Sequence, residues 1–350
     1  MSLPVPHLPP IQPWNTLSPI QKDFAAKILA VHAAMIENMD KNIGKLIQYL
    51  KNTGQYDNTI IVFTSDNGTS EPFEMSQFKY ASGVDLADAK QFISTKNNAL
   101  SNLGNQNSDF NYGPWGPYVT ATPFSGFKTS FYEGGIAVPF IVKPAKWMMS
   151  SLPSSSFVRG YAFVNDVAPT IYQIANVTYP ASYHGHAIHP LMGRSLVPLI
   201  EGKVDNVYAP NEPQGAELFN QTAVRMGDWE AIHDTGNTSL NLYPNGTDVW
   251  RLYNLGSDPG EQKNVAAQHP DILKKMVAAY PVYAKNVGVV IPRGAAYANA
   301  ATHVFPPIST CCPVSINLKQ IPAIPGITRP SNATASYHNQ TAPTAPLPQT

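Results

Sequence analysis

Two short segments of this 350-residue chain contain side chains suited to charge-stabilising chemistry. The first is Asp66-Asn67-Gly68, which is separated from the apolar run Thr59–Thr64 by the single residue Ser65. A carboxylate and an amide oxygen are hard ligands of the kind that Ca²⁺ or Mg²⁺ prefers. The second contains Lys128, whose ammonium could stabilise an anion, and continues through Glu133-Gly134-Gly135. Side chains that follow a strand of an open α/β sheet often lie at a ligand site, so these residues are candidates for one.

Each segment also has a simpler interpretation. Asp, Asn and Gly are common turn residues after any strand, and a lone lysine is usually a solvated surface charge. Paired glycines can indicate only tight backbone geometry. Two oxygen ligands do not complete a coordination shell, so further carboxylates would have to come from elsewhere. If both segments lie at the same edge of a sheet, a cation and an ammonium would together face an anionic substrate.

The elements that would position these residues follow an α/β pattern. Apolar residues recur every three or four positions over 19–52, which predicts a helix with one buried stripe, and Ser18-Pro19 is a typical helix start. The run Thr59–Thr64 and the run Ala137–Val142 predict strands covered on both faces. A helix is predicted over Val164–Ala175, with Ile171 inward. Between the strands, a polar stretch predicts a long functional loop with a short helix near Asp85–Phe92.

The C-terminal part of the chain has a different texture. Short strand-like pieces after Gly202, followed by a helix over Pro270–Lys285, predict a small antiparallel sheet with one helix. The expected organisation is therefore a proline-rich entry linker (1–18), an α/β domain (19–202), a small sheet and helix subdomain (203–292) and a flexible Pro/Ser/Thr-rich tail (293–350).

Composition excludes several classes of protein. Lys+Arg and Asp+Glu both number 23, and no basic run could hold a nucleic-acid backbone. No apolar run is long enough to span a bilayer. The two cysteines, Cys311 and Cys312, are adjacent and cannot form a disulfide framework. Seven N-x-[ST] sequons would suit a secreted glycoprotein, although no signal peptide is visible; the compartment and the oligomeric state stay open.

An ordered set of motifs over about residues 14–292 resembles the C-terminal half of type I sulfatases, particularly arylsulfatases of the bacterial kind. The motifs are His32–Asp40, Asn42–Gly44, Tyr56–Thr59, Ser65–Gly68, Gly113–Pro117, Lys128 with Glu133–Gly135 and Val138-Pro139, Asp166–Thr170, Gly193–Leu196, Arg225–Trp229 and Trp250–Glu261. Any one of these motifs alone is a weak signal, whereas their shared order indicates common descent.

The resemblance implies a fold, a reaction and a site. The fold is the alkaline-phosphatase-like mixed sheet between helices, here incomplete, with a small C-terminal antiparallel sheet and helix subdomain. The reaction is metal-dependent hydrolysis of a small-molecule sulfate ester. Asp66 and Asn67 match the family's metal ligands, normally for Ca²⁺, with Mg²⁺ as a second candidate. Lys128 matches the lysine that contacts the sulfate oxygens.

Departures from the family pattern are also informative. Sulfatases use a formylglycine made from a C/S-x-P-x-R motif in their N-terminal half, and these 350 residues contain no such motif; Cys311-Cys-Pro-Val-Ser315 has Ser315 in place of Arg. The chain is therefore expected to be a fragment that does not turn over alone. Alternatives are a non-catalytic remnant that binds an anion or a partner, or a phosphoesterase of the same superfamily. Glu230 stands where relatives often have lysine and is expected to alter only the surface. His184, His186 and His189 are interpreted as a solvated loop.

Overall fold

The computed structural model describes residues 13–70, 95–109, 115–149, 157–218, 221–234 and 249–290. All of them belong to the unit that spans residues 1–303, and the second unit, 304–350, lies outside the described residues. The predicted helix near Asp85–Phe92, most of the predicted linker and the predicted tail also lie outside them. No described helix is long and apolar enough to cross a membrane.

The first long element is helix α1, Pro19–Asn52, which follows a 3₁₀ turn at Trp14–Thr16 and confirms the predicted helix. Ser18 caps it: the Ser18 N–H donates to Gln21 Oε1 at 2.9 Å and the Gln21 N–H donates to Ser18 Oγ at 3.4 Å. The predicted buried stripe is wrong for most of its length. Ala25 and Ile28 are buried, but Met35 and Leu46 are 66% and 59% exposed. An apolar stripe becomes buried only where another element packs on it.

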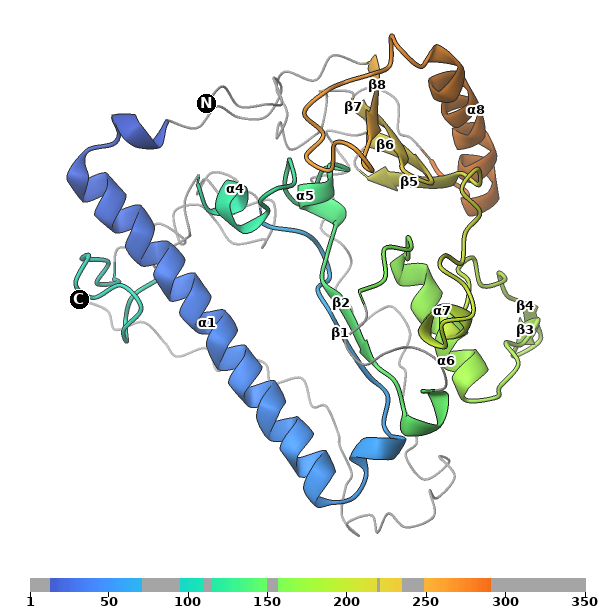
Figure 1. Ribbon diagram of the computed structural model, residues 1–350, viewed down its shortest axis with the longest axis horizontal. Coiled ribbons are helices and arrows are strands. Elements are labelled where there is room, and N and C mark those ends of the chain that lie inside the picture. Colours follow the sequence, from blue (N-terminus) through green and yellow to red (C-terminus); the bar gives the residue numbers. More distant parts are fainter. Residues whose placement is uncertain are drawn as a thin grey trace, which may run out of the picture. The chain divides into compact units, whose positions relative to one another are not determined.

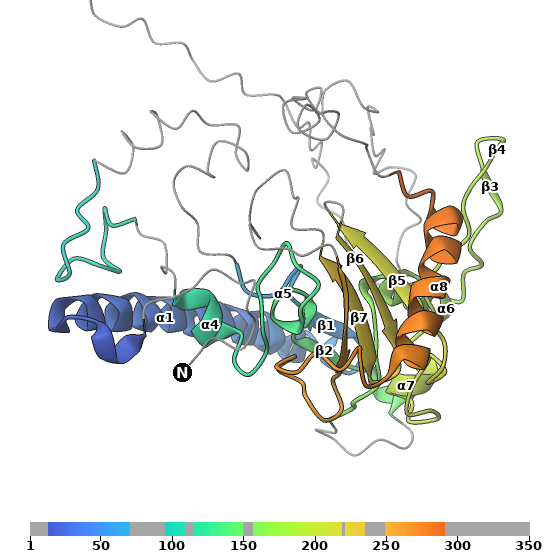
Figure 2. The same ribbon diagram turned by 90° about the horizontal axis from the view of Figure 1, so that it is seen from above.

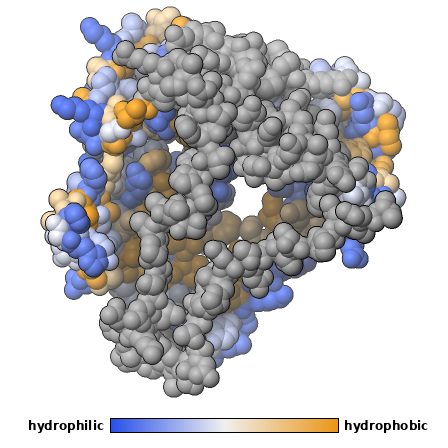
Figure 3. Space-filling model, turned by 180° about the vertical axis from the view of Figure 1, so that it is seen from behind, coloured by the Kyte–Doolittle hydropathy of each residue, from blue (hydrophilic) through white to orange (hydrophobic). Residues whose placement is uncertain are grey.

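Strands β1, Ile61–Thr64, and β2, Phe140–Lys143, pair antiparallel, with Thr64 opposite Phe140 (Figure 1). The prediction that both strands are covered on two faces is wrong: Val62 is 46% and Ile141 60% exposed. Among the described residues β1 pairs only with β2, so a mixed sheet between helices is not seen there. Exposed hydrophobic residues are visible near the centre of the rear view (Figure 3).

The β1–β2 pair is tied to the 3₁₀ turn Tyr56–Asn58 that precedes it. Lys143 Nζ donates to Thr59 O at 2.9 Å and lies 4.1 Å from the centre of the Tyr56 ring. A further 3₁₀ turn, Lys146–Met148, follows β2, and Met148 is buried with Ala145 and Val197. These contacts fix the end of the pair that lies far from Asp66, because the ladder runs from Ile61 opposite Lys143 to Thr64 opposite Phe140.

The second sheet is four-stranded and antiparallel, in the order β5 (Gln214–Leu218), β6 (Gln221–Met226), β7 (Trp229–Asp234) and β8 (Val249–Asn254). Helix α8, Pro270–Val287, packs on one face of it, where Val224, Leu252 and Met276 form a buried cluster (Figure 2). The predicted small sheet with one helix is confirmed. Strand β5 was not predicted, because Gln-Gly-Ala-Glu-Leu contains no β-branched or aromatic residue.

Between the two sheets runs a segment of short elements: the 3₁₀ turn Val164–Asp166, α6 (Val167–Ile174), the hairpin β3 (Ser182–Tyr183) and β4 (His186–Ala187), and α7 (Val197–Ile200). The predicted helix is confirmed, but Ile171 is 58% exposed instead of inward. Asp166 is fully buried and accepts hydrogen bonds at 2.7 Å from the N–H groups of Phe163 and Arg194.

Candidate sulfate-binding site

The two candidate segments lie side by side, joined by backbone hydrogen bonds. The Gly68 N–H donates to Gly135 O at 2.8 Å, and the Thr69 N–H donates to Gly134 O at 3.0 Å. The Lys128 N–H returns a bond to Thr69 O at 2.7 Å. The loop after β1 and the turn before β2 are therefore one structural unit, near the short helix α5, Glu133–Ile136 (Figure 1). The structure brings together the backbones that carry Asp66, Asn67 and Lys128.

Glycines make this close approach possible. A Cβ atom added to Gly68 would lie 2.2 Å from Gly134 O. One added to Gly134 would lie 2.4 Å from Ser125 O, and one added to Gly135 would lie 2.4 Å from Phe127 O. No side chain fits at such distances, so the glycine pair serves backbone-to-backbone packing rather than turn flexibility.

The metal-ligand candidates occupy the tip of the loop after β1. Asp66 is exposed and Asn67 is half-buried. Asn67 Nδ2 donates to Gly68 O at 2.7 Å, which leaves the amide oxygen as the atom that Asn67 can present to a cation. Ser65 Oγ donates to Asn67 O at 2.9 Å and so fixes the backbone of the same loop.

Lys128 lies in a strained turn. The lysine is half-buried, and the next residue, Thr129, has φ = 76°, a left-handed conformation that is unusual for a β-branched residue. Gln221 of β6 donates from Nε2 to Thr129 O at 2.8 Å. Such strain persists only where the surroundings hold it in place, and it is common at ligand-binding sites.

The turn stands on the sheet face opposite α8. Phe127, Phe131 and Tyr132 pack there against Ala223, Ile232 and Tyr253 in one buried cluster. The preceding helix α4, Gly116–Thr120, adds Tyr118 to its edge. The Lys128 turn is thus anchored in the core of the C-terminal sheet. The domain boundary predicted after residue 202 stays a prediction.

A cluster of charged residues lies next to the turn; Glu230 and Glu261 are buried, and Arg225 and Glu133 are part-buried. Arg225 Nη1 donates to Glu133 Oε1 at 3.0 Å, and Glu261 Oε2 accepts the N–H of Glu133 at 2.8 Å. Glu230 is 2% exposed, so the expectation that it alters only the surface is wrong. Its place on β7 turns its side chain inward, because Trp229 and Ala231 face α8.

Burial raises the pKa of each of these three carboxyl groups. The pKa of Glu230 rises to about 8 because the group is desolvated and faces the charge of Glu133, with Arg225 opposing the shift. The pKa of Glu261 is raised well above its usual value by burial and then by Glu230. Burial also raises the pKa of Glu133, while Arg225 lowers it.

Oxygen ligands at Asp66 and Asn67 fit Ca²⁺ or Mg²⁺ in chemistry but not in number. Ca²⁺ takes six to eight oxygens, roughly, and the pair offers one carboxylate and one amide. Within the described ranges, no group of three or more His, Cys, Asp or Glu residues could hold a metal ion. The histidines His184, His186 and His189 are exposed around the β3–β4 hairpin, in agreement with a solvated loop.

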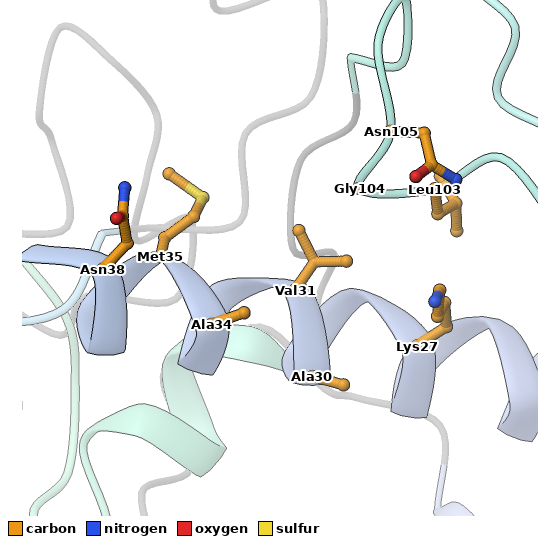
Figure 4. Close-up of a pocket in the computed structure, with 9 residues that line it drawn as sticks. All are labelled: Lys27, Ala30, Val31, Ala34, Met35, Asn38, Leu103, Gly104 and Asn105. Atoms are coloured by element: carbon orange, nitrogen blue, oxygen red, sulfur yellow. The ribbon is translucent and has the colours of Figure 1, made fainter.

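A pocket on α1 lies away from these candidate residues. It has a volume of about 370 Å³ and lies between α1 and the loop at Leu103–Asn105, where Val31 points toward Gly104 (Figure 4). Its lining includes none of Asp66, Asn67 and Lys128. A second pocket, of about 170 Å³, is lined by Arg159, Tyr161 and Arg225 among others.

Comparisons with known proteins agree with the motif pattern. Residues 6–177 match the Sulfatase family model. An uncharacterised sulfatase of Schizosaccharomyces pombe is 35% identical over 285 residues, which are 79% of this chain and 47% of that protein. An arylsulfatase of Klebsiella aerogenes is 33% identical over 195 residues, 55% of this chain and 39% of that enzyme. The crystal structure of Ps i-CgsB in complex with k-i-k-neocarrahexaose aligns with a TM-score of 0.49 at 21% identity, covering 77% of this chain and 48% of that one.

These findings define a class and then a family. The described part is a mixed α/β protein with small antiparallel sheets, and the related proteins are hydrolases of sulfate esters. The chain belongs to the sulfatase family, in the type I group of the alkaline-phosphatase-like superfamily. It spans less than half the length of the relatives named above.

Proposed function

We propose that this chain supplies part of the active site of a metal-dependent sulfate ester hydrolase of the arylsulfatase kind. The observation that carries the proposal is the direct backbone pairing of the Asp66-Asn67 loop with the Lys128 turn. In this arrangement a cation ligand pair and an ammonium belong to one rigid unit. The formylglycine nucleophile and the remaining metal ligands are proposed to come from outside these 350 residues.

Each residue has a role that its chemistry supports. Asp66 Oδ and the Asn67 amide oxygen would hold a Ca²⁺ or Mg²⁺ ion, which, when bound, stabilises charge on the sulfate oxygens. Lys128 would bind a sulfate oxygen and stabilise the charge that develops during transfer. The glycine contacts would keep both groups in fixed register, so that little reorganisation accompanies the reaction.

A phosphoesterase of the same superfamily is the second candidate. Asn67 argues against a zinc-dependent phosphoesterase, because an amide oxygen is a better ligand for a hard cation such as Ca²⁺ than for zinc. A full-length protein that preferred phosphate monoesters to aryl sulfates would favour this second candidate. A chain that bound no cation would favour the non-catalytic remnant.

Calcium titration of the 350-residue chain by calorimetry tests the proposal. We expect weak binding, with a dissociation constant on the order of 10⁻³ M, because only part of the ligand shell is present. Asp66→Ala should lose the binding heat. Asp57→Ala is the matched control, since Asp57 precedes the opposite end of β1 and, among the described residues, its side chain forms only an exposed ion pair with Lys146. Equal heats in the wild type and Asp66→Ala would reject the assignment.

A further inference from the structure

The face of the C-terminal sheet that supports the Lys128 turn carries charged residues in its interior. Arg225 on β6 lies opposite Glu230 on β7, and Glu230 lies opposite Tyr253 on β8. Side chains directly opposite one another point to the same face, so these three form a row. Neutral apolar residues would normally fill such a position, and a buried carboxyl group here needs compensating partners.

Glu261 joins this row from the loop after β8. It is 1% exposed and adopts φ = 53°, a left-handed conformation that is rare for a glutamate. The residues on either side of Glu261 bond to Ser125, which precedes the Lys128 turn. Ser125 Oγ donates to Gly260 O at 2.6 Å, and Gln262 Nε2 donates to Ser125 Oγ at 3.1 Å. The segment 260–262 therefore contacts the turn both at Ser125 and at Glu133.

One oxygen of each buried acid lacks a donor. Glu230 Oε2 and Glu261 Oε1 accept no hydrogen bond from the described residues. The side chains of Glu230 and Glu261 interact directly. Two ionised carboxylates can only accept hydrogen bonds, whereas one proton held by the pair lets one acid donate to the other. Among the described residues, Glu133, Arg225, Tyr161 and Tyr253 interact with one or both members of this pair. Tyr253 in turn interacts with Arg251 and Tyr132.

We propose that Glu261 is a positioning residue of the sulfate site, and that a proton shared with Glu230 keeps its carboxyl group in place. The proposal rests on the function proposed above. Glu261 fixes the N–H of Glu133, the first residue of α5. The next two residues, Gly134 and Gly135, accept the N–H groups of Thr69 and Gly68. A continuous set of contacts thus leads from Glu261 to the loop that carries Asp66 and Asn67.

The arrangement has a consequence for pH. When the shared proton is lost, two negative charges stand side by side in a buried place, and their repulsion drives Glu261 away from Glu133. The Lys128 turn then loses one of its supports. A glutamine at position 230 would donate a hydrogen bond to Glu261 at every pH, and so would remove this dependence.

Hydrogen exchange of the 350-residue chain, followed by mass spectrometry without metal, tests the proposal. In Glu261→Ala, amides in peptides covering 66–70 and 128–136 should exchange at least about tenfold faster than in the wild type, the scale for losing a hydrogen bond to a charged group. Glu261→Gln, which can still accept the Glu133 N–H, should stay within about threefold. Met276→Ala is the matched control: Met276 is equally buried, but it packs on the α8 face. It should leave both peptides unchanged relative to the rest of the sheet.

The pH readout separates positioning from mere structural support. Compared at equal pH, wild type and Glu230→Gln should exchange alike in these peptides at pH 6, and the wild type should be at least about threefold faster at pH 9. Identical exchange in all variants at both pH values would overturn the proposal. If Glu261→Ala does not fold, the Glu230→Gln comparison alone decides. Absence of calcium binding in the wild type would reject the proposed function and leave the exchange result to decide on Glu261.

Discussion

Glu261 Oε2 accepts a hydrogen bond from the backbone N–H of Glu133 at 2.8 Å, across 128 residues of sequence. This bond links the loop after β8 to the turn that carries Lys128. The same turn is bonded through Gly134 and Gly135 to the loop that carries Asp66. The candidate site is consequently held by three segments that are far apart in the sequence.

The buried acid pair should make folding stability depend on pH. The pKa of Glu230 is about 8 in the folded chain, against an ordinary value of 4.5. Between these values the folded chain keeps a proton that the unfolded chain has released. The free energy of unfolding should therefore fall as the pH rises from about 5 to about 8, by up to about 1.4 kcal/mol per pH unit.

Urea unfolding at pH 5 to 9 measures this effect. Glu230→Gln should flatten the decline, because an amide does not titrate. Glu37→Gln is the control, since Glu37 is exposed on α1 and pairs only with Lys41 among the described residues. The interpretation fails if Glu230→Gln declines with the same slope as the wild type.

Gly68→Ala should separate the two halves of the site. The new methyl group would lie 2.2 Å from Gly134 O, a distance that only a backbone shift can relieve. We expect a loss of about 1–3 kcal/mol in the free energy of unfolding and weaker calcium binding. Gly44→Ala is the matched control, because Gly44 lies in α1 with nothing within 4 Å of an added Cβ. It should gain up to about 1 kcal/mol. Equal effects of the two substitutions would show that the loop contact is unimportant.

Lys128→Ala should lower kcat/KM for an aryl sulfate at least about a hundredfold in a full-length sulfatase that contains this chain. This is the usual scale for removing one donor that stabilises charge in the transition state. Lys146→Ala serves as the control, because Lys146 is exposed and its ion pair with Asp57 is long, at 3.5 Å. A loss of less than threefold for Lys128→Ala would remove Lys128 from the site.

The sequence was sufficient to predict those helices and strands that are specified by neighbouring residues. Helix α1 begins at Pro19 because Ser18 and Gln21 cap it, and both signals are visible in the residues. The C-terminal sheet was predicted from the short strand-like pieces after Gly202. The residue pattern alone did not predict that the loops of Asp66 and Lys128 meet, since no local pattern specifies contact between two distant loops. The resemblance to sulfatases supplied that expectation.

Burial was the property that the sequence described least well. Periodicity shows which face a helix can bury, but Met35 and Leu46 are exposed because burial depends on a second element. Glu230 shows the reverse error: a charged residue was assigned to the surface, yet the strand period and the pairing with Arg225 turn it inward. Its position two residues before the buried Ile232 was the available signal.

A crystal structure of the chain with calcium and sulfate tests the central claim most directly. Anomalous scattering should place a Ca²⁺ ion about 2.3–2.6 Å from an Asp66 oxygen and from the Asn67 amide oxygen. A sulfate oxygen should then lie within about 3 Å of Lys128 Nζ. A calcium ion bound away from Asp66, or a Lys128 side chain directed away from the sulfate, would contradict the account.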